Sequence, residues 1–292
     1  MKDLTNLLFE THAFNIAKEN EPFWYTSGKI GPYFVNAEFF YGSDADSKDL
    51  LNFIDNELEN ESKENIPNHI FTKVLNHYNT NNIYKTTIDT MVEYIKNHID
   101  TNSIDYISGG ERRDWFFSNM VAYLLNKPHV TIYKDLTTVE SSFDFTKNII
   151  ISKIENKNFL HVADLLNQSA SFTRAWIPAI ENLGSKIKHA LFVIDRMDGG
   201  TQVLTDCNVT VHSLIKINDD LFLKALELNI INEKQLEILR EFKKDQMASM
   251  KKFLIDHPEF IENSLNSDNP KTAKRAKLLI EQDIYGLGLN NK

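Results

Sequence analysis

The spacing of apolar residues changes several times along the chain. Residues 3–19 carry apolar side chains at helical spacing, whereas the aromatic-rich segment 21–42 alternates and predicts two short strands joined by a turn at SGKIGP. Residues 44–100 return to helical spacing among many Asn, Asp, Glu and Lys residues, which predicts about three helices with solvated faces. From Asp219 onward, a period near 3.6 residues predicts helices again.

Between these helical segments, short apolar runs alternate with helical periods. This alternation predicts an α/β fold in which helices cover a parallel sheet. The predicted strands are 129–135, 159–165 and 209–217, together with 104–110, which runs into a turn, and 188–200, which ends in a polar turn. Helices are predicted for 112–126 and for the segment that follows the 159–165 strand to about 183, and a hairpin is predicted for 143–154.

The composition limits the classes of protein that this chain can represent. It has 292 residues and 42% hydrophobic residues, enough for a sizeable core. A net charge of −9 without a long basic run disfavours nucleic acid or an anionic membrane surface as a partner. The single cysteine, Cys207, fits a reducing compartment. Because we find neither a signal-peptide pattern nor an apolar stretch of membrane length, we expect a cytoplasmic protein.

Polar residues gather where the predicted strands end, the edge at which α/β sheets bind ligands. In SGGERRD (108–114), two glycines permit close backbone approach, and Arg112 and Arg113 add forked cationic donors for an anion. A tight turn before a helix with surface arginines explains the same residues. In ADLLNQSAS (163–171), Asp164 could accept from ribose hydroxyls and the following polar residues could donate to a phosphate, but a helix N-cap is an equal alternative.

Two further segments carry candidate chemistry. In VIDRMDGG (193–200), Arg196 leaves a strand end and could grip a carboxylate, or form a salt bridge with a neighbouring aspartate. In FWYTSGKIGPYF (23–34), Phe34 could stack on a flat ring and Lys29 could meet a charge, although core packing claims most aromatic residues. We find no metal-ligand spacing, GxSxG motif or Walker-type glycine loop.

In this order, the segments resemble the orotate phosphoribosyltransferases. The most specific match is SGKIGPYFVNAEFFYG, which is similar to that family's N-terminal SGRxSPYFxNxxxF segment. YISGGERRDWFFSNMVAYLLNKP resembles GPxYKGIPxAxxxAxxL, FLHVADLLNQSAS lies where the family has its diphosphate-sugar motif, and LFVIDRMDGG resembles a strand ending in DRQEGG. The resemblance covers about 1–43 and 104–217.

The resemblance implies a type I phosphoribosyltransferase fold, a parallel sheet flanked by helices under an N-terminal hood. We expect four parts: an N-terminal helix and hood (1–43), a helical insertion (44–103), a phosphoribosyltransferase-like core (104–218) and a C-terminal helical extension (219–292). The implied substrates are phosphoribosyl diphosphate (PRPP) and orotate or a related base, with Mg²⁺ on the diphosphate. The implied assembly is a homodimer.

Roles follow from the same resemblance, residue by residue. Arg113 takes the place of a PRPP-binding lysine, and Lys134 matches the lysine of an R-K-E strand end. No side chain is singled out as a direct metal ligand. The resemblance implies catalytic roles for Asp164, Lys134 and Arg113, base binding by Phe34, Arg196 and Lys29, and phosphate binding by Arg112, Arg113, Asn167, Gln168, Ser169 and Ser171.

Several positions depart from the family's pattern. Two adjacent acids of the diphosphate-sugar motif are here Ala163 and Asp164, and the glycine of its T-T/A-G loop is Ser169. The family's mobile loop carries K-x-H-G, whereas LTTVESSFDF (136–145) has no cation to neutralise a leaving diphosphate. We therefore weigh an active enzyme against a non-catalytic relative that binds a nucleobase, nucleotide or protein partner. A purely structural subunit that works through its added helices is a third hypothesis.

Overall fold

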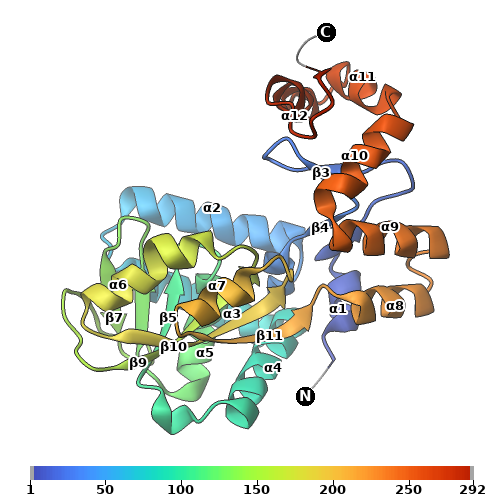
Figure 1. Cartoon of the computed structure of the whole chain (residues 1–292). Coiled ribbons are helices and arrows are strands. Elements are labelled where there is room, and N and C mark those ends of the chain that lie inside the picture. The colour runs from blue at the N-terminus through green and yellow to red at the C-terminus, as the bar shows by residue number, and fades with distance from the viewer. Residues whose placement is uncertain (1–2, 290–292) are drawn as a thin grey trace. The chain divides into compact units, whose positions relative to one another are not determined.

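The computed structural model describes residues 3–289, which form two compact units. The first unit comprises the residues through Ala13 together with Asn36–Ile217, and the second comprises Phe14–Val35 together with the residues from Asn218 onward (Figure 1). One division therefore falls at Ile217, next to a predicted boundary. The aromatic segment of the predicted hood and the predicted C-terminal extension lie in one unit.

The first unit is built on a seven-stranded sheet in the order β11-β10-β9-β5-β6-β7-β8. Pairing is parallel from β11 through β6 and antiparallel from β6 through β8. The predicted α/β class is confirmed. The strands are β5 (Tyr106–Gly110), β6 (His129–Ile132), β7 (Thr138–Ser141), β8 (Asn148–Ile151), β9 (Asn158–Leu166), β10 (Lys186–Asp195) and β11 (Thr210–Lys216).

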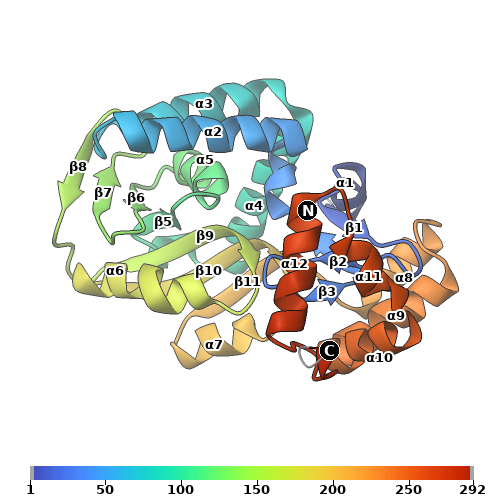
Figure 2. The same ribbon diagram turned by 90° about the horizontal axis from the view of Figure 1, so that it is seen from above.

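Helices cover both faces of this sheet (Figure 2). The α5 helix packs on β5 and β9, and the predicted insertion forms three helices, of which α3 and α4 pack on α5 while α2 packs on α3. On the other face lie α6 and α7. The helices are α1 (Thr5–Glu10), α2 (Asp44–Asn60), α3 (Ile66–Thr80), α4 (Asn82–His98), α5 (Trp115–Leu125), α6 (Ile177–Asn182) and α7 (Gly200–Asp206), with 3-10 turns η1 (Ala37–Tyr41) and η2 (Thr101–Ser103) and a π-helical turn η3 (Phe172–Trp176).

Apolar layers fill the space on each side of the sheet. Between the sheet and α6, the buried cluster includes Phe159, Phe192 and Ile180. On the other side, Phe116 and Met120 of α5 are fully buried. Because both faces are covered, the central strands read as near-continuous apolar runs rather than as an alternating pattern.

The second unit joins the aromatic segment to five C-terminal helices. In it, β1 (Phe14–Ile16) pairs antiparallel with β4 (Tyr33–Val35), and the predicted two-strand turn is present as β2 (Phe23–Trp24) and β3 (Ile30–Gly31). The helices are α8 (Asp219–Glu227), α9 (Glu233–Lys244), α10 (Gln246–Asp256), α11 (Glu259–Leu265) and α12 (Pro270–Glu281).

Aromatic packing and buried hydrogen bonds hold this unit together. The buried ring of Tyr33 lies 5.2 Å from Phe14 and 5.5 Å edge-on to Phe242, measured between ring centroids. The indole nitrogen of Trp24 donates to the hydroxyl of Ser264 (3.1 Å). The prediction of a helix through residue 19 was wrong, because Phe14–Ile16 gains strand partners that its local helical spacing does not reveal.

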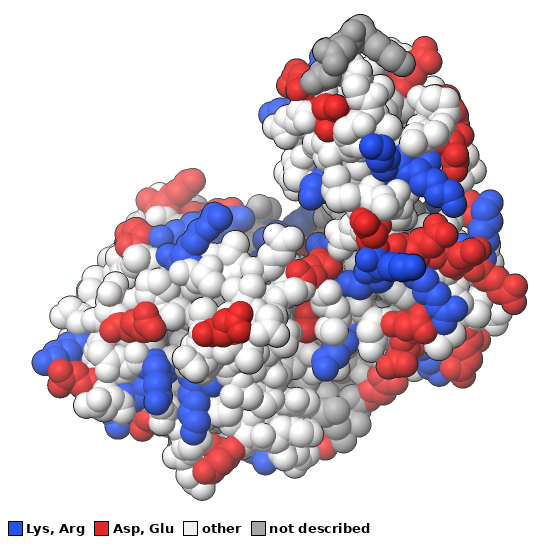
Figure 3. Space-filling model, viewed as in Figure 1, with Lys and Arg blue, Asp and Glu red and all other residues white. Residues whose placement is uncertain are grey.

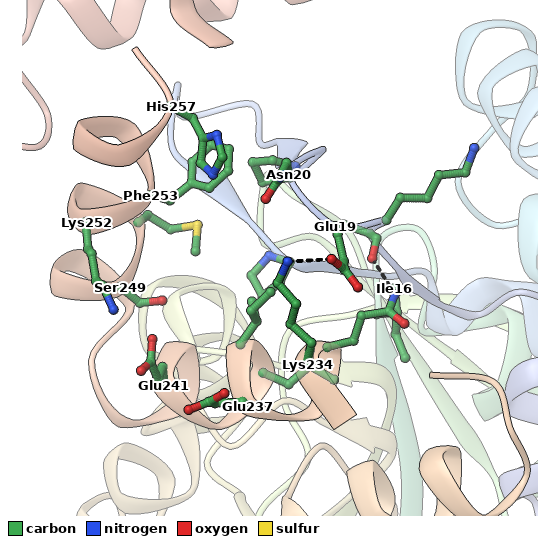
Figure 4. A pocket seen from close by; sticks show the side chains of 18 of the residues that line it. Ile16, Glu19, Asn20, Lys234, Glu237, Glu241, Ser249, Lys252, Phe253 and His257 are labelled. Carbon is green, nitrogen blue, oxygen red and sulfur yellow. Dashed lines mark hydrogen bonds and ion pairs between the residues drawn. The ribbon is translucent and has the colours of Figure 1, made fainter. Parts of the chain in front are cut away.

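The second unit also has a cavity of about 280 Å³ between α9, α10 and residues 16–22 (Figure 4). Its apolar lining includes Met250 and Phe253, and Glu19 and Lys234 form an ion pair of 2.6 Å at its edge. The rest of the lining contains both carboxylates and lysines, so the charge of this cavity does not favour either anionic or cationic ligands.

Charge is mixed on the surface as well. On the face shown in Figure 3, acidic and basic side chains are interspersed rather than gathered by sign.

Within residues 3–289, no helix is both long and apolar enough to span a bilayer.

The predicted loop at 136–145 is partly strand, because β7 continues from a tight turn after β6. The β6–β7 turn is held by the connection between α2 and α3. The Lys63 ammonium donates to Asp135 and to the hydroxyl of Thr137 (2.9 Å), and the hydroxyl of Tyr133 donates to the carbonyl of Lys63 (2.7 Å). The insertion therefore fixes a turn at the place where the family resemblance implied a mobile loop.

We expect Lys63→Met to loosen this turn, because it removes both side-chain bonds and keeps most of the apolar stem. The amide of Leu136, which donates to the carbonyl of Tyr133, should exchange its hydrogen about five- to tenfold faster. Hydrogen exchange followed by mass spectrometry would measure this. The control is Lys73→Met, which breaks the ion pair with Asp49 between α2 and α3. Equal exchange in the two variants would contradict the prediction.

Candidate functional site

A cavity of about 260 Å³ lies at the carboxyl ends of β5 and β9. It brings together most of the residues predicted to bind PRPP, which come from two loops far apart in the sequence. Gln168 is exposed and is not part of the lining. The predicted residues that line the cavity are Arg112, Arg113, Asp164, Asn167, Ser169 and Ser171.

In the loop after β9, Ser169 stands at the glycine position of the family motif and adopts a left-handed backbone conformation, which glycine adopts most easily. Ser169 has a φ of 60°, in the left-handed region, and its buried hydroxyl donates to the carbonyl of Gly200 (3.1 Å). A Cβ on Gly200 would lie 2.1 Å from the carbonyl oxygen of Asn167, so only glycine fits there. The strand end that carries Arg196 thus supports the loop that follows Asp164.

Every predicted cation at this edge is held by a carboxylate. An anion that enters the cavity must therefore compete with side chains of the protein for each of these charges. The pairs are Arg112 with Asp55 of α2, Arg113 Nε with Glu38 Oε1 at 3.0 Å, and Lys134 Nζ with Glu111 Oε1 at 3.0 Å.

Asp164 is half-buried among other carboxylates. Burial raises its pKa, the nearby charges of Asp114 and Glu38 add to the rise, and Arg113 opposes it. Together these effects move the pKa from 3.8 to about 8. The backbone N–H of Leu165 donates to one of its oxygens (2.7 Å). Near neutral pH, the carboxyl therefore carries a proton for much of the time, and a cation or hydroxyl donor would be needed to hold it ionised.

A buried polar chain beneath the cavity was missed from the sequence. His161, fully buried in β9, lies 3.0 Å from the hydroxyl of Ser108 and 3.1 Å from Asp114 Oδ2. The same carboxylate oxygen accepts from the backbone N–H of Gly110 (2.9 Å). The chain orients Asp114 at the start of α5. The sequence feature that could have indicated this buried chain is His161, a histidine within an otherwise apolar predicted strand.

A second cavity, of about 250 Å³, adjoins the first. The two share Glu111, Ser171 and Trp176, and Lys134 lines the second. Arg174 also lines it, and sequence reasoning did not select that residue. The one sequence feature that could have indicated Arg174 is its position three residues after Ser171 in a predicted helix, a spacing that places two side chains on one face.

The predicted base-binding residues are divided between the two units. Arg196 forms the local salt bridge that we weighed as an alternative, with Asp198 Oδ2 3.0 Å from Nε. Phe34 and Lys29 lie in the second unit, where Phe34 is 37% exposed and packs beside Phe23. Base binding by these residues stays a prediction. Within residues 3–289, no group of three or more His, Cys, Asp or Glu residues is arranged to hold a metal ion.

We expect Asp55→Asn to strengthen anion binding, because it releases the Arg112 guanidinium toward the cavity. Partly exposed ion pairs contribute up to about 1 kcal/mol, so the affinity for inorganic phosphate should rise about two- to fivefold. Isothermal titration calorimetry measures the change. Asp49→Asn, which breaks an ion pair elsewhere on α2, should leave the affinity unchanged. Unchanged affinity in Asp55→Asn would show that Asp55 does not compete with anions.

The raised pKa of Asp164 makes a pH-dependent contribution to stability. Because the folded state binds this proton more tightly than the unfolded chain, the free energy of unfolding falls as pH rises from about 4 to about 8. Asp164→Asn cannot ionise, so its melting temperature should match the wild type near pH 4 and exceed it increasingly toward pH 8. Thermal unfolding across this range, with the exposed Asp206→Asn as control, tests the sign. A constant difference would refute it.

No protein-family model matches the chain, but individual proteins do. The adenine phosphoribosyltransferase of Histophilus somni is 27% identical over 177 residues, covering 56% of this chain and 97% of that protein. The orotate phosphoribosyltransferase of Sulfolobus acidocaldarius is 20% identical over 220 residues, covering 75% of this chain and 87% of that protein.

Solved structures agree on the fold. The orotate phosphoribosyltransferase of Francisella tularensis superposes with a TM-score of 0.51 at 13% identity, covering 84% of this chain and 97% of that one. The UMP synthase of Leishmania donovani gives a TM-score of 0.50 at 12% identity, covering 82% of this chain and 41% of that one. The predicted resemblance to the orotate phosphoribosyltransferases is confirmed, and this chain is a relative of the phosphoribosyltransferases with their type I fold.

Proposed function

We propose that this protein transfers the ribosyl phosphate of PRPP to orotate or a related base. The observation that carries the proposal is the cavity at the ends of β5 and β9. Its lining includes two arginines, a carboxyl and three polar residues of the following loop: Arg112, Arg113, Asp164, Asn167, Ser169 and Ser171. Two cations and a loop with left-handed backbone suit phosphate groups, and a carboxyl at the strand end suits ribose hydroxyls. The sequence relatives include an adenine phosphoribosyltransferase and an orotate phosphoribosyltransferase.

In the proposed reaction, the bond between ribose C1 and the diphosphate oxygen breaks, and its electron pair leaves with the diphosphate. A lone pair on the base nitrogen forms the new bond to C1, and the proton that this nitrogen carried passes to the solvent. The sugar becomes transiently cationic and the diphosphate gains charge, so positioning and charge stabilisation supply the catalysis. Asp164 would accept from the ribose hydroxyls, and in its ionised form both of its oxygens are acceptors.

Mg²⁺ belongs to this proposal as part of the substrate. It prefers oxygen ligands, which the diphosphate and the ribose hydroxyls of PRPP provide, and the family resemblance assigns Asp164 to those hydroxyls. A cation there would also favour ionisation of Asp164 and so lower its pKa. We expect the role of this chain to be the orientation of a magnesium–PRPP complex.

The choice of base rests on Arg196 of the first unit, and the family resemblance assigns a stacking role to Phe34 of the second unit. Arg196 can bind a carboxylate, which orotate has and adenine lacks, provided that it exchanges its partner Asp198 for the ligand. Phe34, partly exposed, offers a ring for stacking. These residues favour orotate, while the H. somni relative is a reason to test adenine.

A specific observation favours the second candidate function, a binding protein without transfer activity. The three predicted cations at this edge of the sheet are each paired with a carboxylate, and Lys63 holds the turn after β6. Such a site can bind a nucleotide without stabilising a leaving diphosphate. The cytoplasmic location and the homodimer implied by the resemblance stay predictions, and sedimentation would test the latter.

The test is turnover of PRPP with Mg²⁺ and either orotate or adenine, with the nucleotide product resolved by chromatography. We expect product with orotate, and Asp164→Asn should lower kcat/KM about ten- to a hundredfold by removing a charged hydrogen-bond acceptor. Asp206→Asn is the matched control. Product with adenine alone would overturn the choice of base. Binding of PRPP or orotate monophosphate without turnover would favour the second candidate.

A further inference from the structure

The second cavity contains a cation that the motif comparison does not cover. Arg174 lies on η3, beyond the loop that resembles the diphosphate-sugar motif, and it is exposed. Among residues 3–289, no ion pair holds its guanidinium, in contrast to Arg112, Arg113 and Lys134. It is therefore the cation at this edge of the sheet that a ligand can engage without displacing a carboxylate.

The cavity around Arg174 has room for a charged group of modest size. Small side chains, Ala170 and Ala175, form part of its lining, and the ring of Trp176 forms another part. Trp176 sits there because Gly110 has no side chain: a Cβ on Gly110 would lie 2.2 Å from a ring carbon. Lys134 faces the same cavity from the end of β6.

The position of this cavity relates it to the first one. Both cavities are bounded by Glu111, Ser171 and Trp176, so they form adjoining compartments. Ser171 and Arg174 line the second cavity together, and Ser171 lines the first as well. A ligand with two anionic groups can thus contact the loop and Arg174 together.

We propose that Arg174, with Lys134, binds the leaving diphosphate of PRPP and supplies positive charge that residues 136–145 lack. This inference rests on the proposed function. As the C1–oxygen bond breaks, the electron pair and the added negative charge pass to the diphosphate, and Arg174 stabilises that charge with two forked donors. No proton or redox partner is required of Arg174, because a guanidinium stays protonated.

The first experiment measures anion binding without catalysis. Inorganic diphosphate and inorganic phosphate are titrated, each with Mg²⁺, into wild type, Arg174→Gln, Arg174→Lys and Lys186→Gln. Lys186 is an exposed cation at the start of β10, the opposite end of the sheet, so it controls for lost net charge. We expect Arg174→Gln to weaken diphosphate binding about tenfold and phosphate binding less than twofold, with partial recovery in Arg174→Lys.

Several results would overturn the inference. These are no diphosphate binding by the wild type, equal weakening in Arg174→Gln and Lys186→Gln, or equal loss of phosphate and diphosphate affinity in Arg174→Gln. Where turnover is observed, Arg174→Gln should lower kcat about a hundredfold and change KM less, because the charge develops in the transition state.

The two proposals can fail separately. Turnover that is unaffected by Arg174→Gln would leave the proposed function intact and refute the role of Arg174. Diphosphate binding that depends on Arg174, in a protein that forms no nucleotide, would refute transfer activity. In that case, the anion site would remain part of a binding protein.

Discussion

Close backbone packing at the carboxyl edge of the sheet is the constraint on which the site depends. Side chains are excluded at Gly109, Gly110 and Gly200, where a Cβ would lie about 2 Å from Ser118, Trp176 or the carbonyl of Asn167. Because these approaches are so close, the loop after β9 is pressed against the turn after β10, and Trp176 is pressed against β5. The two cavities are the space that remains between these segments.

Charge pairing within this space defines the resting state of the site. Carboxylates neutralise Arg112, Arg113 and Lys134, and burial keeps Asp164 partly protonated near neutral pH. Such an arrangement stabilises the ligand-free protein, since these three cations do not repel one another unpaired. It also means that the binding free energy of a phosphate ligand is the difference between the interactions it forms with these cations and the ion pairs that it displaces.

The helical insertion takes part in the same edge of the sheet. It contributes Asp55 to Arg112 from α2, and the connection between α2 and α3 holds the β6–β7 turn through Lys63. The insertion therefore contributes side chains to the candidate site and does not form a separate domain. The family resemblance did not predict this, because the insertion lies outside the segments that match.

Local pattern in the sequence was sufficient for the mostly parallel sheet, for the insertion helices and for the loops that carry Arg113, Asp164 and Arg196. Periodicity and motif order are properties of neighbouring residues, so they can be read without the fold. The helix expected through residue 19 failed because Phe14–Ile16 finds its strand partner in Tyr33–Val35.

Only the tertiary structure decided which charges meet and which remain available. The pairing of Arg112 with Asp55 spans 57 residues, and the chain His161–Asp114 spans 47, distances over which no local pattern operates. Arg174 lines the second cavity together with Trp176, which packs against Gly110, 66 residues earlier in the sequence. The sequence by itself determined the fold class and the segments of the site, whereas long-range packing determined the electrostatics within it, because charges interact through space and not along the chain.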